Sequence, residues 1–328
     1  MGSIPPLVNP APPRGQYLAT VAANIPLCDE HFRLILSLPE FPPTDPGQFI
    51  QIACHDLSPR DHAADDSALE WDWTPGDHFG LRDPHLLHPV AMLRRPFSLA
   101  GRRDVGTSVE LDIIHRVVGI GTAWLADLRI SDRVGILGPL GNRFALPAPH
   151  QTALLIGGGV GIPPMLYLAQ RLKARRAVAF CGATRRDLLP LHLIANHPPS
   201  DQPTPTHCIA EFADCGIPSV ITTDDGSLGF RGLVTQAVER YLDEASDPAS
   251  HLLYTCGPEP MMKRVADIAA RRGIECQIAV ERAMACGMGT CQSCCIRVKV
   301  PMRPDGRDWV YRLACTDGPV FKGSDLLW

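Results

Sequence analysis

The chain has 328 residues, of which 45% are hydrophobic and 20% charged, so it can bury a sizeable core and is long enough for about two or three domains. A formal net charge of -4 gives no electrostatic reason to expect nucleic acid or an anionic membrane as a partner. The first 16 residues show no basic region followed by an apolar stretch, and glycines and prolines interrupt the most apolar segment, 153–169. We therefore expect a cytoplasmic protein without a membrane span.

Short apolar runs separated by Gly and Pro fill the first 149 residues. They are residues 17–25, 32–38, 48–54, 97–103, 108–118 and 132–144. Such runs predict an antiparallel β-barrel domain over residues 1–149.

One stretch, residues 55–88, interrupts the predicted barrel. It is acidic and rich in turn residues, which indicates an inserted loop. It contains five of the twelve histidines: His55, His62, His78, His85 and His88. Because their spacing is irregular, we expect a solvated loop rather than a metal site.

The pattern changes near residue 150. Residues 152–176 combine an apolar strand, a Gly-rich turn and an amphipathic helix, 177–183 form a second buried strand, and 251–273 repeat the first pattern. Strands that alternate with helices predict an α/β domain with a parallel sheet, here over residues 150–273. The remaining residues, 274–328, form a small cysteine-bearing module.

Four cysteines crowd the segment ACGMGTCQSCCIRV, residues 285–298. A C-x4-C-x2-C run followed by a distant cysteine is the plant-type [2Fe–2S] spacing. The positions that match it are Cys286, Cys291, Cys294 and Cys315. Gly287 and Gly289 permit the tight backbone that a cluster loop needs and leave N–H groups free to donate to sulfur.

A disulfide knot and a zinc site are the alternatives for these cysteines. A reducing compartment disfavours the disulfide. Zinc sites usually pair two short C-x2–4-C knuckles, whereas only one is present here, so we favour the iron–sulfur cluster. Cys295 adjoins Cys294, and in a continuing strand its side chain points away from the cluster, so we expect it not to be a ligand.

Three further motifs indicate nucleotide binding. GGGVGIPP, residues 157–164, lies between a strand and a helix, where backbone N–H groups favour phosphate, although its spacing is not G-x-G-x-x-G. TCGPEPMM, residues 255–262, places a second Gly-Pro turn at the same sheet edge. RRPFS, residues 94–98, offers a cation, an aromatic ring and a hydroxyl, but can also be read as an ordinary edge strand.

The order RPFS, IHRVVGIGT (114–122), GGGVGIPP and CGPEPMM resembles the ferredoxin reductase superfamily. The tail VERAMACGMGTCQSCCIRV with LACTDGPVF is similar to the electron-transfer subunits of class B dihydroorotate dehydrogenase. The resemblance covers nearly the whole chain except residues 55–88 and the extreme N-terminus. The insertion lengthens a connection that is short in the family, and Ser293 stands where glycine is common.

The resemblance implies that the β-barrel binds FAD, the α/β domain binds NAD and the C-terminal module carries a [2Fe–2S] cluster. Its FAD residues would be Arg95, Pro96, Phe97, Ser98, Ile114, His115, Arg116, Gly121 and Thr122, with Arg95 near the phosphates and Ser98 near the flavin ring. Its NAD residues would be Gly157, Gly158, Gly159, Gly161, Cys256, Gly257 and Pro258. Its cluster ligands would be Cys286, Cys291, Cys294 and Cys315.

In function, the resemblance implies an oxidoreductase component of pyrimidine biosynthesis. Electrons would pass from dihydroorotate through a partner's FMN, the cluster and FAD to NAD⁺. The roughly 250-residue barrel that oxidises dihydroorotate does not fit in this chain, so a catalytic FMN subunit is expected as partner, in a heterotetramer. Two alternatives stay open: an NAD(P)H-dependent iron–sulfur flavoprotein reductase for a hydrogenase, ferredoxin or oxygenase, and a zinc- or redox-binding regulatory protein. The sequence does not distinguish NAD from NADP.

Overall fold

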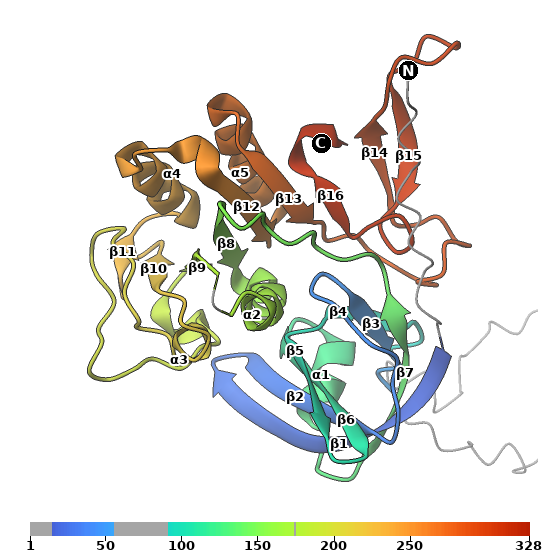
Figure 1. Ribbon diagram of the computed structural model, residues 1–328. Helices are drawn as coiled ribbons and strands as arrows, with labels where there is room; N and C mark the ends of the chain where they lie inside the picture. The colour runs from blue at the N-terminus through green and yellow to red at the C-terminus, as the bar shows by residue number, and fades with distance from the viewer. Residues whose placement is uncertain (1–14, 56–90, 174) are drawn as a thin grey trace, which may run out of the picture.

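The computed structural model describes residues 15–55, 91–173 and 175–328. An antiparallel sheet, blue to teal in Figure 1, lies below an α/β layer, and a small group of strands from the C-terminal end stands beside them. Apart from His55, the predicted insertion at 55–88 lies outside the described residues. No helix in the described ranges is both long and apolar enough to cross a membrane.

The first sheet is antiparallel, as predicted, and its seven strands follow the order β4-β3-β7-β1-β2-β6-β5. They are β1 (Gly15–Cys28), β2 (His31–Leu38), β3 (Phe49–Ile52), β4 (Arg95–Ser98), β5 (Gly101–Val105), β6 (Ser108–Arg116) and β7 (Arg133–Leu140). Alternate residues face a shared core, as Leu34, Leu36 and Leu38 do on β2. Helix α1 (Ile120–Ala126) follows β6 and contributes Leu125 to that core.

The second sheet has the order β11-β10-β9-β8-β12-β13-β16 and is parallel except for β16. Its strands are β8 (Thr152–Gly158), β9 (Ala177–Ala183), β10 (Ser219–Thr223), β11 (Phe230–Arg231), β12 (His251–Cys256), β13 (Glu275–Ala279) and β16 (Val320–Lys322). The helices are α2 (Ile162–Arg171), α3 (Ala210–Ala213), α4 (Val234–Glu244) and α5 (Glu259–Arg272). Figure 1 shows α4 and α5 on one face and α2 and α3 on the other. Burial on both faces explains why the strands read as continuous apolar runs.

The C-terminal residues contribute to two sheets. Strands β13 and β16 extend the α/β sheet, because β13 pairs with β12 and β16 pairs with β13. A separate three-stranded sheet contains β14 (Cys295–Lys299), β15 (Trp309–Leu313) and β17 (Leu326–Leu327). The domain limits at 149/150 and 273/274 stay predictions; the pairing shows that the last module shares strands with the layer before it.

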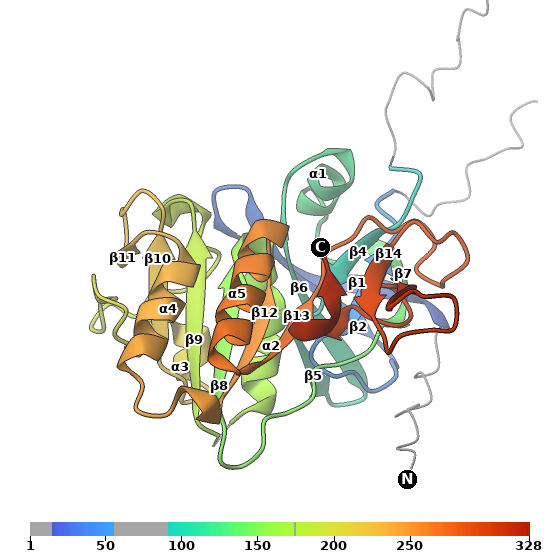
Figure 2. The same ribbon diagram turned by 90° about the horizontal axis from the view of Figure 1, so that it is seen from above.

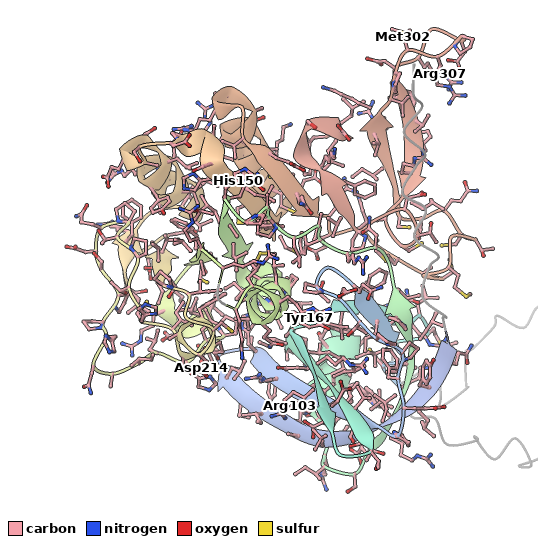
Figure 3. The ribbon with its side chains drawn as sticks, in the orientation of Figure 1. Arg103, His150, Tyr167, Asp214, Met302 and Arg307 are labelled. Carbon is pink, nitrogen blue, oxygen red and sulfur yellow. The ribbon has the colours of Figure 1, made fainter. Side chains whose placement is uncertain are left out.

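Side chains at the junction of the two large sheets fix their relative position, which Figure 2 shows from above. The Tyr167 hydroxyl of α2 donates to the Thr44 carbonyl at 2.7 Å, and Figure 3 shows Tyr167 between α2 and the antiparallel sheet. Asp45 accepts hydrogen bonds from Arg143 at 2.7 Å and from Arg171 of α2 at 2.5 Å. The edges that carry the predicted motifs therefore face one another.

Candidate functional site

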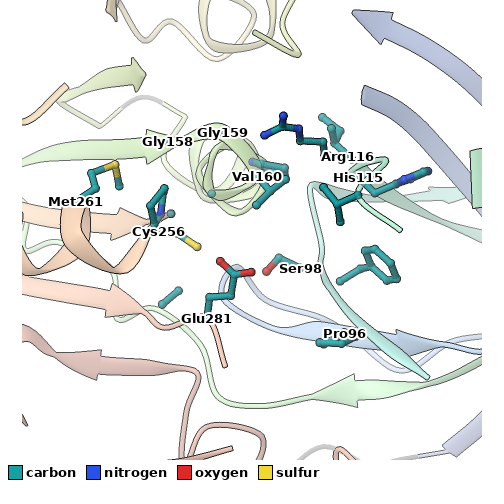
Figure 4. Close-up of a pocket in the computed structure, with 18 of the residues that line it drawn as sticks. Pro96, Ser98, His115, Arg116, Gly158, Gly159, Val160, Cys256, Met261 and Glu281 are labelled. Carbon is teal, nitrogen blue, oxygen red and sulfur yellow. The ribbon is translucent and has the colours of Figure 1, made fainter. Parts of the chain in front are cut away.

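A cavity of about 1290 Å³ lies between the antiparallel sheet and the α/β sheet (Figure 4). Ligand pockets usually measure roughly 300–1,000 Å³, so this cavity has room for more than one small molecule. Every residue that the resemblance assigned to FAD or NAD lines it, except Gly157, which lies further inside β8. The structure thus gathers motifs from two domains into one site.

On the antiparallel side, β4 and the end of β6 form the wall. Arg95 donates one hydrogen bond to the Leu93 carbonyl, at 3.1 Å, and no carboxylate of the described residues forms an ion pair with it. By contrast, Arg116 is paired with Glu30 at 2.7 Å. Arg95 therefore keeps donors available for a phosphate, which its fork geometry suits.

Two buried histidines line the same wall. His115 is 2% exposed and neither ring nitrogen has a partner, and Nε2 of His31 is equally without one. Burial, together with the nearby His31, lowers the pKa of His115 to about 4, so its imidazole is neutral at pH 7. A neutral imidazole offers one donor and one acceptor. Buried polar groups normally have partners, so these atoms fit a polar ligand in the cavity.

On the α/β side, the two Gly-rich turns lie against each other, as expected from the neighbouring strands β8 and β12. A Cβ on Gly161 would lie 2.1 Å from the Cys256 carbonyl oxygen, so the close backbone approach requires glycine there. Gly159, with φ of +53°, has no atom within 4 Å of its Cβ position and faces open space. A phosphate group could approach the backbone at Gly159, which supports the predicted nucleotide role of this turn.

Three polar side chains meet where the two walls converge. In Figure 4 the Glu281 carboxylate points toward the Ser98 hydroxyl, and the Cys256 thiol points into the same space. Burial, and then the charge of Glu281, raises the pKa of Cys256 to about 12, so the thiol stays protonated at neutral pH. Glu281 is not among the predicted site residues, although it follows closely after strand β13.

Other lining residues outside the predicted site lie at or directly after the ends of further strands of this sheet. Gly182, Ala183 and Thr184 lie at the end of β9, and Asp224 directly follows β10. In open α/β sheets, ligands bind beyond the carboxyl ends of the strands. That rule, applied to every strand, was the signal that could have found them.

The cysteine loop has the tight geometry that its glycines predict. Gly287 and Gly289 have φ of +69° and +88°, a region that favours glycine. The Cys286 sulfur accepts backbone hydrogen bonds from Met288 and Cys291, each at 3.4 Å. Such N–H groups stabilise a thiolate that is bound to iron.

Two further predicted ligands are buried. Cys294 and Cys315 are buried, and the Ala314 amide donates to the Cys294 carbonyl at 3.1 Å. Burial, and then hydrogen bonding to Cys294, raises the pKa of Cys315 to about 12, a value for the thiol without metal. Cys295 begins strand β14, as expected, and is exposed.

In the described part of the chain, no three His, Cys, Asp or Glu side chains converge as the ligands of one metal ion would. The backbone donors to the Cys286 sulfur and the positive φ of Gly287 and Gly289 fit a loop that holds a thiolate-bound cluster.

Comparison with solved structures defines the class of fold. The structure of an NADH-dependent reduced ferredoxin-NADP oxidoreductase superposes with a TM-score of 0.67 and 24% identity, covering 96% of this chain and 91% of that one. The ferredoxin reductase of carbazole 1,9a-dioxygenase gives a TM-score of 0.55 and 19% identity, covering 81% of this chain and 68% of that one. The fold is that of the ferredoxin reductases, as the motif order predicted.

Sequence comparison then gives the family. Residues 281–327 match the iron–sulfur cluster binding domain of dihydroorotate dehydrogenase B. The dihydroorotate dehydrogenase B (NAD(+)) electron transfer subunit of Caldanaerobacter subterraneus subsp. tengcongensis is 33% identical over 72% of this chain and 81% of its own length. The subunit of the same name from Geobacillus thermodenitrificans is 34% identical over 77% of this chain and 86% of its own length. The chain belongs to the family of dihydroorotate dehydrogenase B electron transfer subunits.

Proposed function

We propose that this protein passes electrons between NAD and a dihydroorotate dehydrogenase catalytic subunit, as an oxidoreductase component of pyrimidine biosynthesis in the cytoplasm. The observation that carries the proposal is that one short segment of the chain joins the cavity wall to the cysteine loop. Met284 lines the cavity, and Cys286 lies two residues further along the chain. The segment that lines the nucleotide cavity therefore leads directly into the cluster loop.

The residues of the antiparallel wall would hold FAD. Arg95 would pair with its phosphates, and Gly121 and Thr122 at the start of α1 would approach its pyrophosphate. Ser98 and the neutral imidazole of His115 would orient its polar atoms. We propose the same role for the rest of the predicted set, Pro96, Phe97, Ile114 and Arg116, which lines the cavity with them.

The residues of the α/β wall would hold the nicotinamide nucleotide. Gly159 exposes its backbone to the cavity, and Cys256 lines the cavity at the end of the neighbouring strand, where its carbonyl lies against Gly161. Asp224 lines the cavity directly after strand β10, where an acidic side chain can bind a ribose hydroxyl and repels a 2′-phosphate. This placement supports NAD over NADP, in agreement with the NAD(+) in the relatives' names.

Bound FAD supplies the exchange between hydride chemistry and one-electron transfer, and the [2Fe–2S] cluster supplies the one-electron step. The protein's own part is to hold the groups in line and exclude water. Ser98, Cys256 and Glu281 occupy the point where the walls converge, and a thiol with a pKa of about 12 gives up no proton there at neutral pH. Oxidation of dihydroorotate itself belongs to the FMN subunit, with which we propose a heterotetramer.

The test is reconstitution with the catalytic subunit from the same organism. Purified anaerobically, the chain alone should contain FAD, iron and acid-labile sulfide and should reduce an artificial acceptor with NADH, but should not oxidise dihydroorotate. The mixture should form a stable complex with NAD-dependent dihydroorotate oxidation. Failure to bind, together with rapid electron transfer to a ferredoxin, would favour a general reductase. A colourless protein that contains zinc would favour the regulatory alternative.

A further inference from the structure

Strand β3 has two different faces. Ile50 and Ile52 belong to the core of the antiparallel sheet. Phe49 and Gln51 point the other way, since successive side chains of a strand alternate, and Phe49 packs in the cluster of buried residues that contains Cys294 and Cys315. The strand is therefore shared between the wall of the cavity and the cysteine module.

Gln51 is a fully buried polar residue on the module side of this strand, with 0% of its surface exposed. Its Nε2 donates to the Ala285 carbonyl at 3.4 Å, directly before Cys286 in the chain. Its Oε1 has no hydrogen-bond partner in the structure. A buried unsatisfied amide oxygen costs about 1–3 kcal/mol, so core packing alone would favour an apolar side chain.

The same carboxamide rests on Gly287. A Cβ on Gly287 would lie 2.6 Å from Oε1 of Gln51 and 2.8 Å from its Cδ. The positive φ of +69° favours glycine at this position, and its lack of a side chain lets the Gln51 carboxamide lie directly against it. The carbonyl before Cys286 and the Cα after it both touch one side chain from the other domain.

The backbone of Gln51 meanwhile supports the cavity wall. In the antiparallel register Gln51 lies opposite Pro96, and Phe49 lies opposite Ser98. Pro96, Ser98 and Phe49 all line the cavity. Gln51 therefore pairs through its backbone with the strand proposed to bind flavin and contacts through its side chain the loop proposed to hold the cluster.

A second amide holds the other cysteine segment. Asn142 follows strand β7, and its Nδ2 donates to the carbonyls of Asp317 and Val320 at 3.0 and 2.8 Å. Its Oδ1 accepts from the Val320 amide at 2.8 Å. The turn after Cys315 is thus fixed to the antiparallel domain by a side chain whose hydrogen bonds are complete, unlike those of Gln51.

We propose that Gln51 is a positioning residue that seats Cys286 and its loop against the flavin-binding strand and so sets the rate of electron transfer between cavity and cluster. The inference rests on the proposed function and adds to it a residue outside every motif. It accounts for a buried amide that the fold alone does not require. It also accounts for the close contact between the Gln51 carboxamide and Gly287.

The test is Gln51→Leu in the full chain, purified anaerobically with both cofactors. NADH supplies two electrons, of which the cluster accepts one while the other stays on the flavin. Rapid mixing therefore follows flavin reduction and cluster reduction separately. We expect flavin reduction by NADH to be unchanged and cluster reduction to slow roughly tenfold, the low end for residues that orient metal ligands. The EPR spectrum of the reduced cluster should shift in its g values, because Cys286 loses its support.

Gln277→Leu is the matched control. Gln277, on strand β13, is also a buried glutamine. Its Oε1 accepts from the Ala145 amide at 2.8 Å, and its Nε2 donates to the Ala145 carbonyl at 3.1 Å. Its loss should lower stability yet leave the EPR spectrum and the cluster rate as in wild type. If Gln51→Leu does not fold, Gln51→Met keeps the length of the side chain, removes the Nε2 donor and should show the same slowing.

The outcomes separate the inference from the function beneath it. A wild-type chain that binds no FAD or iron, or whose cluster is not reduced by NADH, contradicts the proposed function. A competent wild type with an unchanged spectrum and rate in both Gln51 variants contradicts the positioning role alone. Equal slowing in the Gln277 variant would also contradict it, since the effect would then be one of general stability.

Discussion

Ser293 illustrates how one residue adapts the cysteine loop. Its hydroxyl lies 3.2 Å from the Cys291 sulfur. Hydrogen bonds from Ser293, and then from the Cys286 segment, lower the pKa of Cys291 to about 6. Because the thiolate is the form that binds metal, this serine is compatible with a ligand role for Cys291.

The first prediction separates ligand from bystander among these cysteines. Cys291→Ser should remove most of the iron and acid-labile sulfide, because a hydroxyl replaces a thiolate of the four. Cys295→Ser should leave both near wild type, since Cys295 is exposed at the start of β14. Both are measured by iron and sulfide analysis of anaerobically purified protein. Loss of iron in the Cys295 variant would overturn the ligand assignment.

At the scale of elements, the strand-to-turn junctions position the site. Strands β8 and β12 are parallel neighbours, so their turns end at one edge of the sheet. Within the first turn, Gly161 is tied to the packing of Cys256, whereas Gly159 is open to the cavity. Two glycines of one turn thus have different surroundings: Gly161 is required for packing, and Gly159 is free to contact a ligand.

The second prediction tests this division. Gly161→Ala should lower the free energy of unfolding by about 3 kcal/mol, the upper end for overpacking, because the new methyl meets backbone that cannot move aside. Gly106→Ala is the control: its φ is +58° but nothing lies within 4 Å, so only the dihedral cost of about 1 kcal/mol applies. Urea denaturation compares the two. Equal losses would show that no close backbone contact exists at Gly161.

At the scale of the whole molecule, the two large domains are joined by a charged contact beside their buried interface. Asp45 lies between β2 and β3, and Arg171 lies on α2 of the other domain. Burial would raise the pKa of Asp45, but the hydrogen bonds from Arg143 and Arg171 outweigh it and hold the pKa below its ordinary value of 3.8. The carboxylate is therefore more stable in the folded protein than in the unfolded chain.

The third prediction follows from the sign of that shift. The pKa of Asp45 is lower in the folded protein than in the unfolded chain. Asp45 therefore stabilises the folded protein at a pH above its pKa in the unfolded chain, and this contribution is lost as the pH falls through its pKa in the folded protein. The difference in Tm between wild type and Asp45→Asn should be complete at neutral pH and shrink below about pH 4. Asp305→Asn is the control, because Arg307 also lowers the pKa of Asp305 but both lie in one exposed loop. A difference independent of pH would contradict the ion-pair explanation.

The sequence by itself determined the features that depend on neighbours in the chain. Short apolar runs separated by Gly and Pro predicted the strands of the first sheet, apolar runs next to helical patterns predicted β8, β9 and β12, and the spacing of four cysteines predicted the cluster loop. The strand that continues from Cys295 is present as β14, and the prediction that Cys295 is not a ligand stays a prediction. These features could be predicted because each depends on the periodicity or the spacing of residues that are close together in the chain.

Only the tertiary structure decided which distant residues meet. Gln51 touches Ala285, which is 234 positions away in the chain, and Glu281 faces Ser98 across the cavity. The end of strand β13 points to Glu281 as a residue near the ligand edge, but not to Ser98 as the residue that it faces. No local pattern marks Gln51, a single polar residue in the otherwise apolar strand β3. Such contacts form only when the two sheets and the module pack together. Close packing joins side chains that are far apart in the chain, so a short stretch of sequence does not contain both partners.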